Sequence, residues 1–288
     1  MKLQAALEYL NTYIWAILII AVVLVVMIQL NVFNPNFWAA KQQPGSCTIL
    51  RIQLGGATLH CTGNSLIPEF TASFSQQSAT IDSAIEAAVG SSQPITSQIT
   101  ITFWADDSPS CTSANACTYL HLSGAGEASC SGYSGLWITE GQSDLCTSAG
   151  SASLVYPAPH SWAFYAITIS PNLAVSYENA VQTQQSSTIG SISISNIVMG
   201  DYNYPGSANW DSYNGHLANV QIYNTSLSAN QINRLYLEGI GGPPIDLRYL
   251  VGWWPLNGDS GDYSGYGNTG TTANVIFTNN WYNDYTQP

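Results

Sequence analysis

The chain has 288 residues, of which 8% are charged and 11% aromatic, and its formal net charge at pH 7 is −12. Ordinary soluble domains carry about 25% charged residues, so much of this surface must be built from Ser, Thr, Asn, Gln and Gly. With only five Lys and Arg in total, the chain lacks the basic surface that neutralises phosphates, which excludes a nucleic-acid-binding function.

Residues 4–33 form a long apolar stretch at the start of the chain. No charged residue occurs between Glu8 and Lys41, and residues 14–27 are apolar throughout. A helix of about 20 such residues crosses a bilayer, so we expect a transmembrane helix. A secretory signal peptide is the alternative, but its apolar region is only about 7 to 15 residues long and ends in a small-residue cleavage site. That site is missing here, and Lys2 as the only preceding basic residue favours an outside location for the bulk of the chain.

Glu8 stands out because a carboxylate at the centre of a membrane helix costs about 2.5 to 3.5 kcal/mol, and less near the interface. In one interpretation it lies among headgroups and complements the positive end of the helix dipole. In the other, Gln4, Ala6 and Glu8 resemble the Q-x-[SA]-x-E start of archaeal class III signal peptides of type IV pilin-like proteins. The resemblance implies cleavage between Leu3 and Gln4 and pairing of Glu8 with the new α-amine of a neighbouring subunit.

Residues 34–46 form a collar, whose Pro35, Pro44 and Gly45 end the helix. The remaining residues, 47–288, could form one all-β sandwich, since about 200 to 250 residues are a usual size for such a domain.

All six cysteines follow the apolar stretch, and their even number indicates three disulfides in an oxidising compartment. Metal binding is the competing interpretation, but C-x-x-C pairs and suitably spaced histidines are missing. Six cysteines allow fifteen pairings. We expect the pairs that close short loops between neighbouring strands, which are Cys47 with Cys61, Cys111 with Cys117, and Cys130 with Cys146.

Short β-type runs separated by turn residues dominate the rest of the chain. Residues 98–104 and 190–199 alternate polar and apolar side chains, and residues 161–177 read as two strands about a Pro171-Asn172 turn. Residues 81–89 are more helical in composition, and we expect a short helix or turn there.

Residues 227–239 predict one soluble helix. Ser228 at the N-cap and Gln231 at N3 make a capping box, Leu227 can pack on Ile232, and Gly239 suits the position after the helix. The apolar face of this helix should lie on the sandwich.

A second resemblance emerges from these segments. Residues 162–166 with 173–179 resemble the W-x-[FHY]-x-A…L-x-[LV]-x-Y-x-[ND]-G strand pair of the laminin G-like, concanavalin A-type jelly roll, with Ala180 where that pattern has Gly. Residues 215–228 are similar to the closing strand and helix cap of that family. Residues 252–259 and 262–270 resemble its opening strand. The resemblance covers about residues 66–277 and implies an all-β sandwich with one short helix.

The order of these segments is unusual, because the segment that opens the family's fold ends this chain. It could be a truncated second repeat, a circular permutation in which residues 251–277 complete their own sheet, or a segment donated to the sheet edge of a neighbouring molecule. We expect residues 251–288 to complete their own sandwich, because the chain holds one set of the other strands.

The jelly-roll family often binds carbohydrate, sometimes through calcium. Asn257, Asp259 and Asp262 group the hard oxygen donors that calcium takes, and a polar turn is the alternative. Two further loop segments combine aromatic rings with amides and carboxylates, which suits stacking on sugars, although they could equally be loop structure. The candidate glycan-binding residues are Asp201, Tyr202, Asn203, Trp210, Asp211 and Asn214.

Catalysis is not expected. Sandwich glycosidases need two carboxylates, usually placed as E-x-D-x-x-E, and this motif is absent from the sequence, as are H-E-x-x-H, G-x-S-x-G and a P-loop. We therefore expect a subunit of an extracellular type IV pilin-like filament, a homopolymer through its N-terminal helix, which lies in the membrane before assembly and carries a lectin-like head. The alternative is a membrane-anchored monomeric carbohydrate-binding protein.

Overall fold

The computed structural model describes residues 18–23, 47–52, 56–61, 67–75, 83–90, 95, 97–107, 117–124, 129–130, 133–147, 149–157, 161–187, 190, 192–203, 212–281 and 285–288. The chain divides into two units, Met1–Lys41 and Gln42–Pro288. In the first unit, residues 18–23 are helical and exposed. Leu3, Gln4, Ala6, Glu8, the rest of the predicted N-terminal helix and the collar lie outside the described residues. Within the described ranges, no helix is both long and apolar enough to span a membrane.

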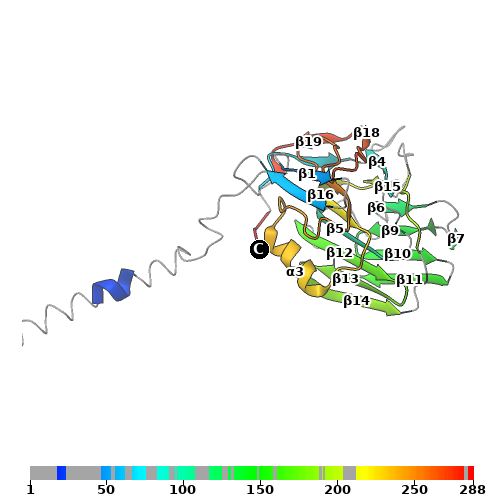
Figure 1. The fold of residues 1–288 in the computed structure, drawn as a ribbon, viewed down its shortest axis with the longest axis horizontal. Coiled ribbons are helices and arrows are strands. Elements are labelled where there is room, and N and C mark those ends of the chain that lie inside the picture. The colour runs from blue at the N-terminus through cyan, green and yellow to red at the C-terminus, as the bar shows by residue number, and fades with distance from the viewer. Residues whose placement is uncertain are drawn as a thin grey trace, which may run out of the picture. The chain divides into compact units, whose positions relative to one another are not determined.

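The second unit is a sandwich of two antiparallel sheets (Figure 1). The seven-stranded sheet has the order β11-β10-β9-β6-β15-β4-β18. Its strands are β4 (Ala84–Ala88), β6 (Thr118–Ser123), β9 (Leu136–Thr139), β10 (Gln142–Thr147), β11 (Gly150–Val155), β15 (Asn196–Met199) and β18 (Thr271–Ala273).

The eight-stranded sheet has the order β14-β13-β12-β5-β16-β3-β19, and its eighth strand, β17, pairs with β16. The strands are β3 (Thr71–Phe74), β5 (Ile99–Asp107), β12 (Ala163–Ser170), β13 (Leu173–Glu178), β14 (Val181–Ser187), β16 (Gly215–Tyr223), β17 (Leu250–Trp254) and β19 (Ile276–Thr278). Two small hairpins complete the strands, β1 (Cys47–Ile52) with β2 (Gly56–Cys61), and β7 (Ser129–Cys130) with β8 (Tyr133–Ser134).

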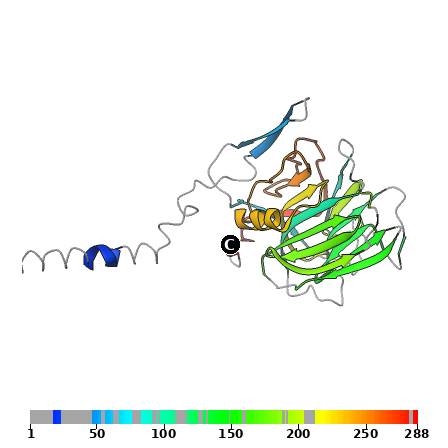
Figure 2. The same cartoon turned by 60° about the horizontal axis from the view of Figure 1, so that its bottom comes forward.

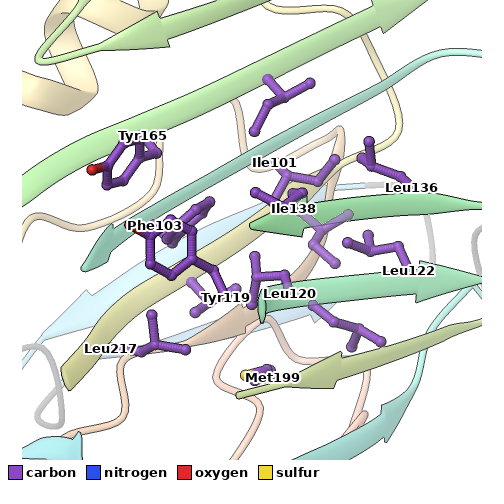
Figure 3. Packing of buried hydrophobic residues seen from close by; sticks show 14 of the residues in the cluster. Ile101, Phe103, Tyr119, Leu120, Leu122, Leu136, Ile138, Tyr165, Met199 and Leu217 are labelled. Atoms are coloured by element: carbon purple, nitrogen blue, oxygen red, sulfur yellow. The ribbon is translucent and has the colours of Figure 1, made fainter. Parts of the chain in front are cut away.

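The main core lies between the two sheets (Figure 3). Side chains alternate across a strand, so Ile99, Ile101 and Phe103 of β5 all enter this core. The ring of Phe103 stacks on that of Tyr165, with 5.3 Å between centroids, and lies 5.5 Å from that of Tyr119. The strand predicted at residues 98–104 is therefore confirmed, but it is buried on both faces rather than half-buried, since residues 99–105 are all buried.

A second apolar cluster covers the other face of the eight-stranded sheet. Trp104, Phe164 and Trp253 point to this face and are packed by Ile232 and Leu235 of helix α3 (Ala229–Glu238), gold in Figure 2. All members of both clusters lie within residues 47–285. A chain that begins at Gln42 therefore keeps every member of both clusters.

The helix forms as its sequence predicts. Ser228 is the N-cap, its hydroxyl accepts a hydrogen bond from the Gln231 amide, and the Gln231 side chain accepts one from the Ser228 amide at 2.9 Å. Gly239 follows the helix with φ of 80°, which favours glycine. Leu227 and Ile232 are both buried in the second cluster.

The strand pair at residues 161–177 is also confirmed, as β12 and β13 with a turn at residues 171–172. The next turn joins β13 to β14 through Asn179 and Ala180, whose φ angles are 48° and 62°. Two successive residues with positive φ are the hallmark of a type I′ hairpin, so the turn forms although Ala180 replaces glycine. Asn179 also stabilises the turn, because its side-chain carbonyl accepts a hydrogen bond from the Phe164 backbone amide at 3.0 Å.

Two expectations need correction. The helix or turn predicted at residues 81–89 is wrong, because residues 84–88 form strand β4, which pairs with both β15 and β18 and buries Ile85 completely. Among the described residues of 190–199, only 196–199 form a strand, and Ile194 makes a single bridge to Ile95. In both cases pairing with distant strands overrides local composition.

The disulfides Cys47–Cys61 and Cys130–Cys146 are present as expected. Cys117 is also disulfide-bonded, while Cys111 lies outside the described residues. These disulfides indicate an oxidising environment outside the cytoplasm.

The C-terminal segment pairs with strands of its own chain. β17 pairs with β16, β18 with β4 and β19 with β3, all antiparallel. The C-terminal segment therefore contributes strands to both sheets of the sandwich.

Candidate functional site

A single row of side chains crosses the outer face of the seven-stranded sheet. Register pairs join its members strand by strand. In each of these strands except β18, an adjacent residue belongs to the main core. From β11 to β18 the row consists of Ser153, Asp144, Trp137, His121, Val198, Glu86 and Thr271; we call it the outer row. The second cluster and α3 belong to the other sheet. In the outer row, the two end residues are exposed, Trp137 and Glu86 are half-buried, and Asp144, His121 and Val198 are buried.

Three aromatic rings gather at the centre of the outer row. The ring of Tyr202 stacks on that of His121, with 4.0 Å between centroids and 14° between planes. It meets Trp137 edge to face at 5.1 Å. The backbone carbonyl of Tyr202 lies 2.7 Å from Nδ1 of His121, and the indole N–H of Trp137 donates to the Thr118 hydroxyl at 2.9 Å. These contacts fix the orientation of the rings.

Asp201 holds Tyr202 in this position. This residue is 1% exposed, and its carboxylate accepts hydrogen bonds from the Ser212 hydroxyl at 3.0 Å and from the Asn203 backbone amide at 3.1 Å. The preceding Gly200 amide donates to the Tyr119 carbonyl at 2.9 Å. The loop is therefore anchored to β6, and Asp201 serves as a positioning residue.

Polar groups flank the rings along the outer row. The Asp144 carboxylate accepts hydrogen bonds from the side-chain amide of Gln142 at 2.6 Å and from the Ser153 hydroxyl. On the other side, Asn196 donates to Glu86 at 2.9 Å. Planar aromatic rings between such groups match the two features of a sugar, its apolar ring face and its rim of hydroxyls.

The outer row contains two carboxylates, Asp144 and Glu86, and no Lys or Arg. The five basic residues of the chain are Lys2, Lys41, Arg51, Arg234 and Arg248, and none belongs to a strand of the seven-stranded sheet.

The structure brings only part of the predicted glycan set together. Asp201, Tyr202 and Asn203 lie at the outer row, Asn214 is half-buried just before β16, and Trp210 and Asp211 lie outside the described residues. Sequence reasoning missed Trp137, His121 and Asp144. A signal existed for Trp137, because in Leu136-Trp137-Ile138-Thr139 a tryptophan occupies the face opposite two core residues.

The predicted calcium ligands form a hydrogen-bonded turn. Asp262 accepts from the amides of Trp253, Ser264 and Asn268 and from the Ser264 hydroxyl, at 2.8 to 3.0 Å. Asn257 accepts from the Phe70 amide at 2.8 Å, and Asp259 from the Gly261 amide and the Tyr263 hydroxyl. Since a carboxylate offers about four acceptor sites, Asp262 is saturated by the turn. In the described part of the chain, no three His, Cys, Asp or Glu residues group to hold a metal.

The polar bonds of Asp259 also affect its neighbour. Burial, together with the hydrogen bond to Asp259 and the charge of that carboxylate, raises the pKa of Tyr263 to about 12. The phenol therefore stays protonated as a donor throughout the physiological range.

No protein-family model and no curated protein matches this sequence. Solved structures that resemble this one include a candidate carbohydrate-binding protein from Bacteroides ovatus ATCC 8483, at 14% identity and a TM-score of 0.55 over 77% of this chain and 63% of that one. The chain thus spans less than two thirds of that protein. A heptameric SAP-like pentraxin from Limulus polyphemus is 12% identical, with a TM-score of 0.49 over 73% of this chain and 94% of the pentraxin.

The ligand-binding domain of botulinum neurotoxin serotype D, solved with N-acetylneuraminic acid, is 16% identical with a TM-score of 0.41, over 70% of this chain and 55% of that one. At such identities the likenesses concern the fold alone. The fold is an all-β, concanavalin A-like sandwich of two antiparallel sheets.

Proposed function

We propose that the sandwich is a lectin-like head that binds carbohydrate at the outer row. The observation that carries the proposal is the arrangement of Trp137 and Tyr202, whose rings are fixed between Asp144 and Glu86 on the outer face of the seven-stranded sheet. The similar fold of the candidate carbohydrate-binding protein from Bacteroides ovatus supports it.

The charge of the face selects the ligand class. A sialylated or sulfated glycan would bring its negative charge toward Asp144 and Glu86 without a Lys or Arg to pair with. A neutral glycan meets hydroxyl acceptors, amides and aromatic rings. The proposed ligands are therefore neutral oligosaccharides, bound without catalysis.

A titration of immobilised glycans tests this proposal with the chain from Gln42 to Pro288. Replacing Trp137 by Ala should weaken binding at least about fivefold, because stacking on an aromatic ring contributes about 1 to 3 kcal/mol. Tyr249→Ala, a half-buried aromatic outside the seven-stranded sheet, is the matched control and should change binding less than about twofold. A wild-type chain that binds no glycan, or binds equally after Trp137→Ala, overturns the proposal.

The same titration with EDTA tests calcium. The sequence predicts calcium at Asn257, Asp259 and Asp262. A calcium ion bound there would have to replace the hydrogen bonds that backbone amides now donate to Asp262. Binding that disappears with EDTA and returns with calcium would establish the ion as part of the site.

We further propose that the head is carried by a type IV pilin-like filament at the cell surface, in adhesion or cell contact. This part rests on the resemblance of Gln4, Ala6 and Glu8 to a processed pilin start. Many copies on one filament would strengthen weak glycan binding by multivalency. Mass determination of the chain from its native membrane should find Gln4 at the N-terminus, whereas an intact Met1 would favour the membrane-anchored monomer.

A further inference from the structure

A row of side chains crosses the outer face of the eight-stranded sheet, on the same side as the second cluster. Trp104 of β5 pairs with Ala218 of β16, and Thr71 of β3 pairs with Thr278 of β19. The register of β16 with β3, continued by one residue, sets Ala218 beside Thr71. All four side chains lie on the outer face, because a strand neighbour of each belongs to the main core or packs against it. Ala218 therefore places only a methyl group between Trp104 and Thr71.

Four described residues of this face bury a polar atom that makes no hydrogen bond. They are Thr71 and Thr278 at Oγ1, Trp104 at Nε1 and His216 at Nδ1. Thr71 is 0% exposed and Trp104 is 2% exposed. His216 is a neighbour of this row, because it pairs with Asp106, two residues from Trp104 on β5. A buried donor or acceptor that lacks a partner costs free energy, so these atoms call for a bound molecule. We call the four residues the covered site.

Trp281 lies over this part of the sheet. Its backbone carbonyl accepts a hydrogen bond from the Trp162 indole at 2.9 Å, and its own indole N–H donates to the Glu69 carbonyl at 3.4 Å. Trp162 immediately precedes β12 and Glu69 shortly precedes β3, and in the sheet β5 and β16 lie between those two strands. The Trp162 ring also stacks on that of His216, with 6.3 Å between centroids. Trp281, which is 3% exposed, thus covers β5 and β16.

We propose that the covered site binds neutral hydroxyl groups, which are those of water or of a sugar. The site needs a ligand that both donates and accepts hydrogen bonds. The indole N–H of Trp104 only donates, whereas a threonine hydroxyl donates one hydrogen bond and accepts others. An apolar ligand would leave all of these atoms unpaired. The site belongs to the other sheet from the outer row, and the proposal does not rest on glycan binding there.

Charged ligands fit the covered site poorly. The carboxylate of Asp106 lies 4.0 Å from Nδ1 of His216, and β3, β5, β16 and β19 contain no Lys or Arg, so an anion would be repelled. A cation would meet the N–H of Trp104, which offers no lone pair. Burial lowers the pKa of His216 to about 4, so its ring is neutral at pH 7 and Nδ1 donates or accepts according to the tautomer. The arrangement therefore selects a neutral ligand.

Replacement of threonine by valine tests whether the covered site is occupied, because it removes the hydroxyl and keeps the shape of the side chain. If a ligand bonds the Thr71 hydroxyl, Thr71→Val should lower the Tm of the chain from Gln42 to Pro288 by at least about 2 °C. If nothing bonds it, the variant loses only an unpaired buried hydroxyl, and its Tm should rise.

Thr100→Val is the matched control in the same sheet. The Thr100 hydroxyl donates to the Thr225 carbonyl at 2.7 Å and accepts from the Leu227 amide at 2.8 Å. This variant therefore measures the fall in Tm that follows the loss of a bonded hydroxyl. A Tm of Thr71→Val that is unchanged or higher than that of the wild type, while Thr100→Val falls, overturns the proposal.

Neutral sugars then separate the two sources of the hydroxyl group. Glucose, galactose, mannose and N-acetylglucosamine are added in excess to Trp137→Ala, which lacks the proposed outer-row contact. If a sugar is the ligand, one of them should raise the Tm, and the rise should disappear when Thr71→Val is added. If water is the ligand, no sugar should act through Thr71, and a crystal structure should show a water bonded to its hydroxyl. A crystal structure with neither molecule there overturns the proposal, whatever glycans bind at the outer row.

Discussion

The guanidinium of Arg51 lies over the ring of Tyr266, with 3.7 Å between its Cζ atom and the ring centroid. The same group donates to the carbonyls of Ser264, Leu247 and Leu250 at 2.9, 3.2 and 2.8 Å. The first described hairpin is thereby fastened to the last segment of the chain.

Replacing Arg51 by Met should lower the free energy of unfolding by about 2 kcal/mol, because three carbonyls lose a charged donor and the ring loses its cation. Arg51→Lys should recover less than half, since an ammonium lacks the planar fork that reaches three carbonyls. Urea unfolding monitored by tryptophan fluorescence measures both. Full recovery by Lys would show that charge alone matters.

Ala180 adopts φ of 62° in the β13–β14 turn, a conformation that glycine adopts without strain. Ala180→Gly should therefore stabilise the protein by about 0.5 to 1 kcal/mol. Glycine relieves the backbone strain of the folded state, and this gain exceeds the cost of the larger conformational entropy that glycine gives to the unfolded chain. Thermal unfolding should show a higher Tm. Ala166→Gly, at a buried position of β12, is the control and should lower the Tm; a lower Tm for both would refute strain at Ala180.

Burial lowers the pKa of His216 from 6.5 to about 4, although Asp106 lies 4.0 Å away. The unfolded chain takes up this proton near pH 6.5 and the folded chain only near pH 4. The free energy of unfolding should therefore fall by about 3 kcal/mol as the pH falls from 6.5 to 4, and this group should add no further loss below that range.

Urea unfolding at several pH values should show a shallower loss for His216→Gln over this window. The exposed His60→Gln is the control and should follow the wild type. Parallel curves for the wild type and His216→Gln would assign the pH dependence to other groups.

Removal of residues 251–288 should abolish cooperative unfolding. The segment supplies most of β17, which pairs with β16, as well as the fully buried rings of Trp253 and Trp254. Near-ultraviolet circular dichroism and calorimetry of the truncated chain should show no native transition. Removal of the exposed Pro288 alone should leave the melting curve unchanged, and an unchanged curve for the long deletion would contradict the prediction.

The sequence alone determined the features that depend on neighbours in the chain. The capping box of Ser228 and Gln231, the β12–β13 pair and the Cys47–Cys61 disulfide each form within about twenty residues, where spacing and periodicity specify the partner. The resemblance to a jelly roll rested on the same local patterns. Tyr202 and Asp201 were found because they form one loop segment rich in aromatic and polar groups.

Tertiary structure decided the rest, because strand pairing joins residues that are far apart in sequence. Residues 81–89 have a helical composition, but β4 within them forms a strand because it pairs with β15 on one side and β18 on the other. Trp137 and His121 lie side by side under Tyr202, and Asp144 lies beside Trp137, only through the register of β10, β9 and β6. Side-chain alternation specifies a face of a strand, whereas only the assembled sheet determines which faces lie side by side.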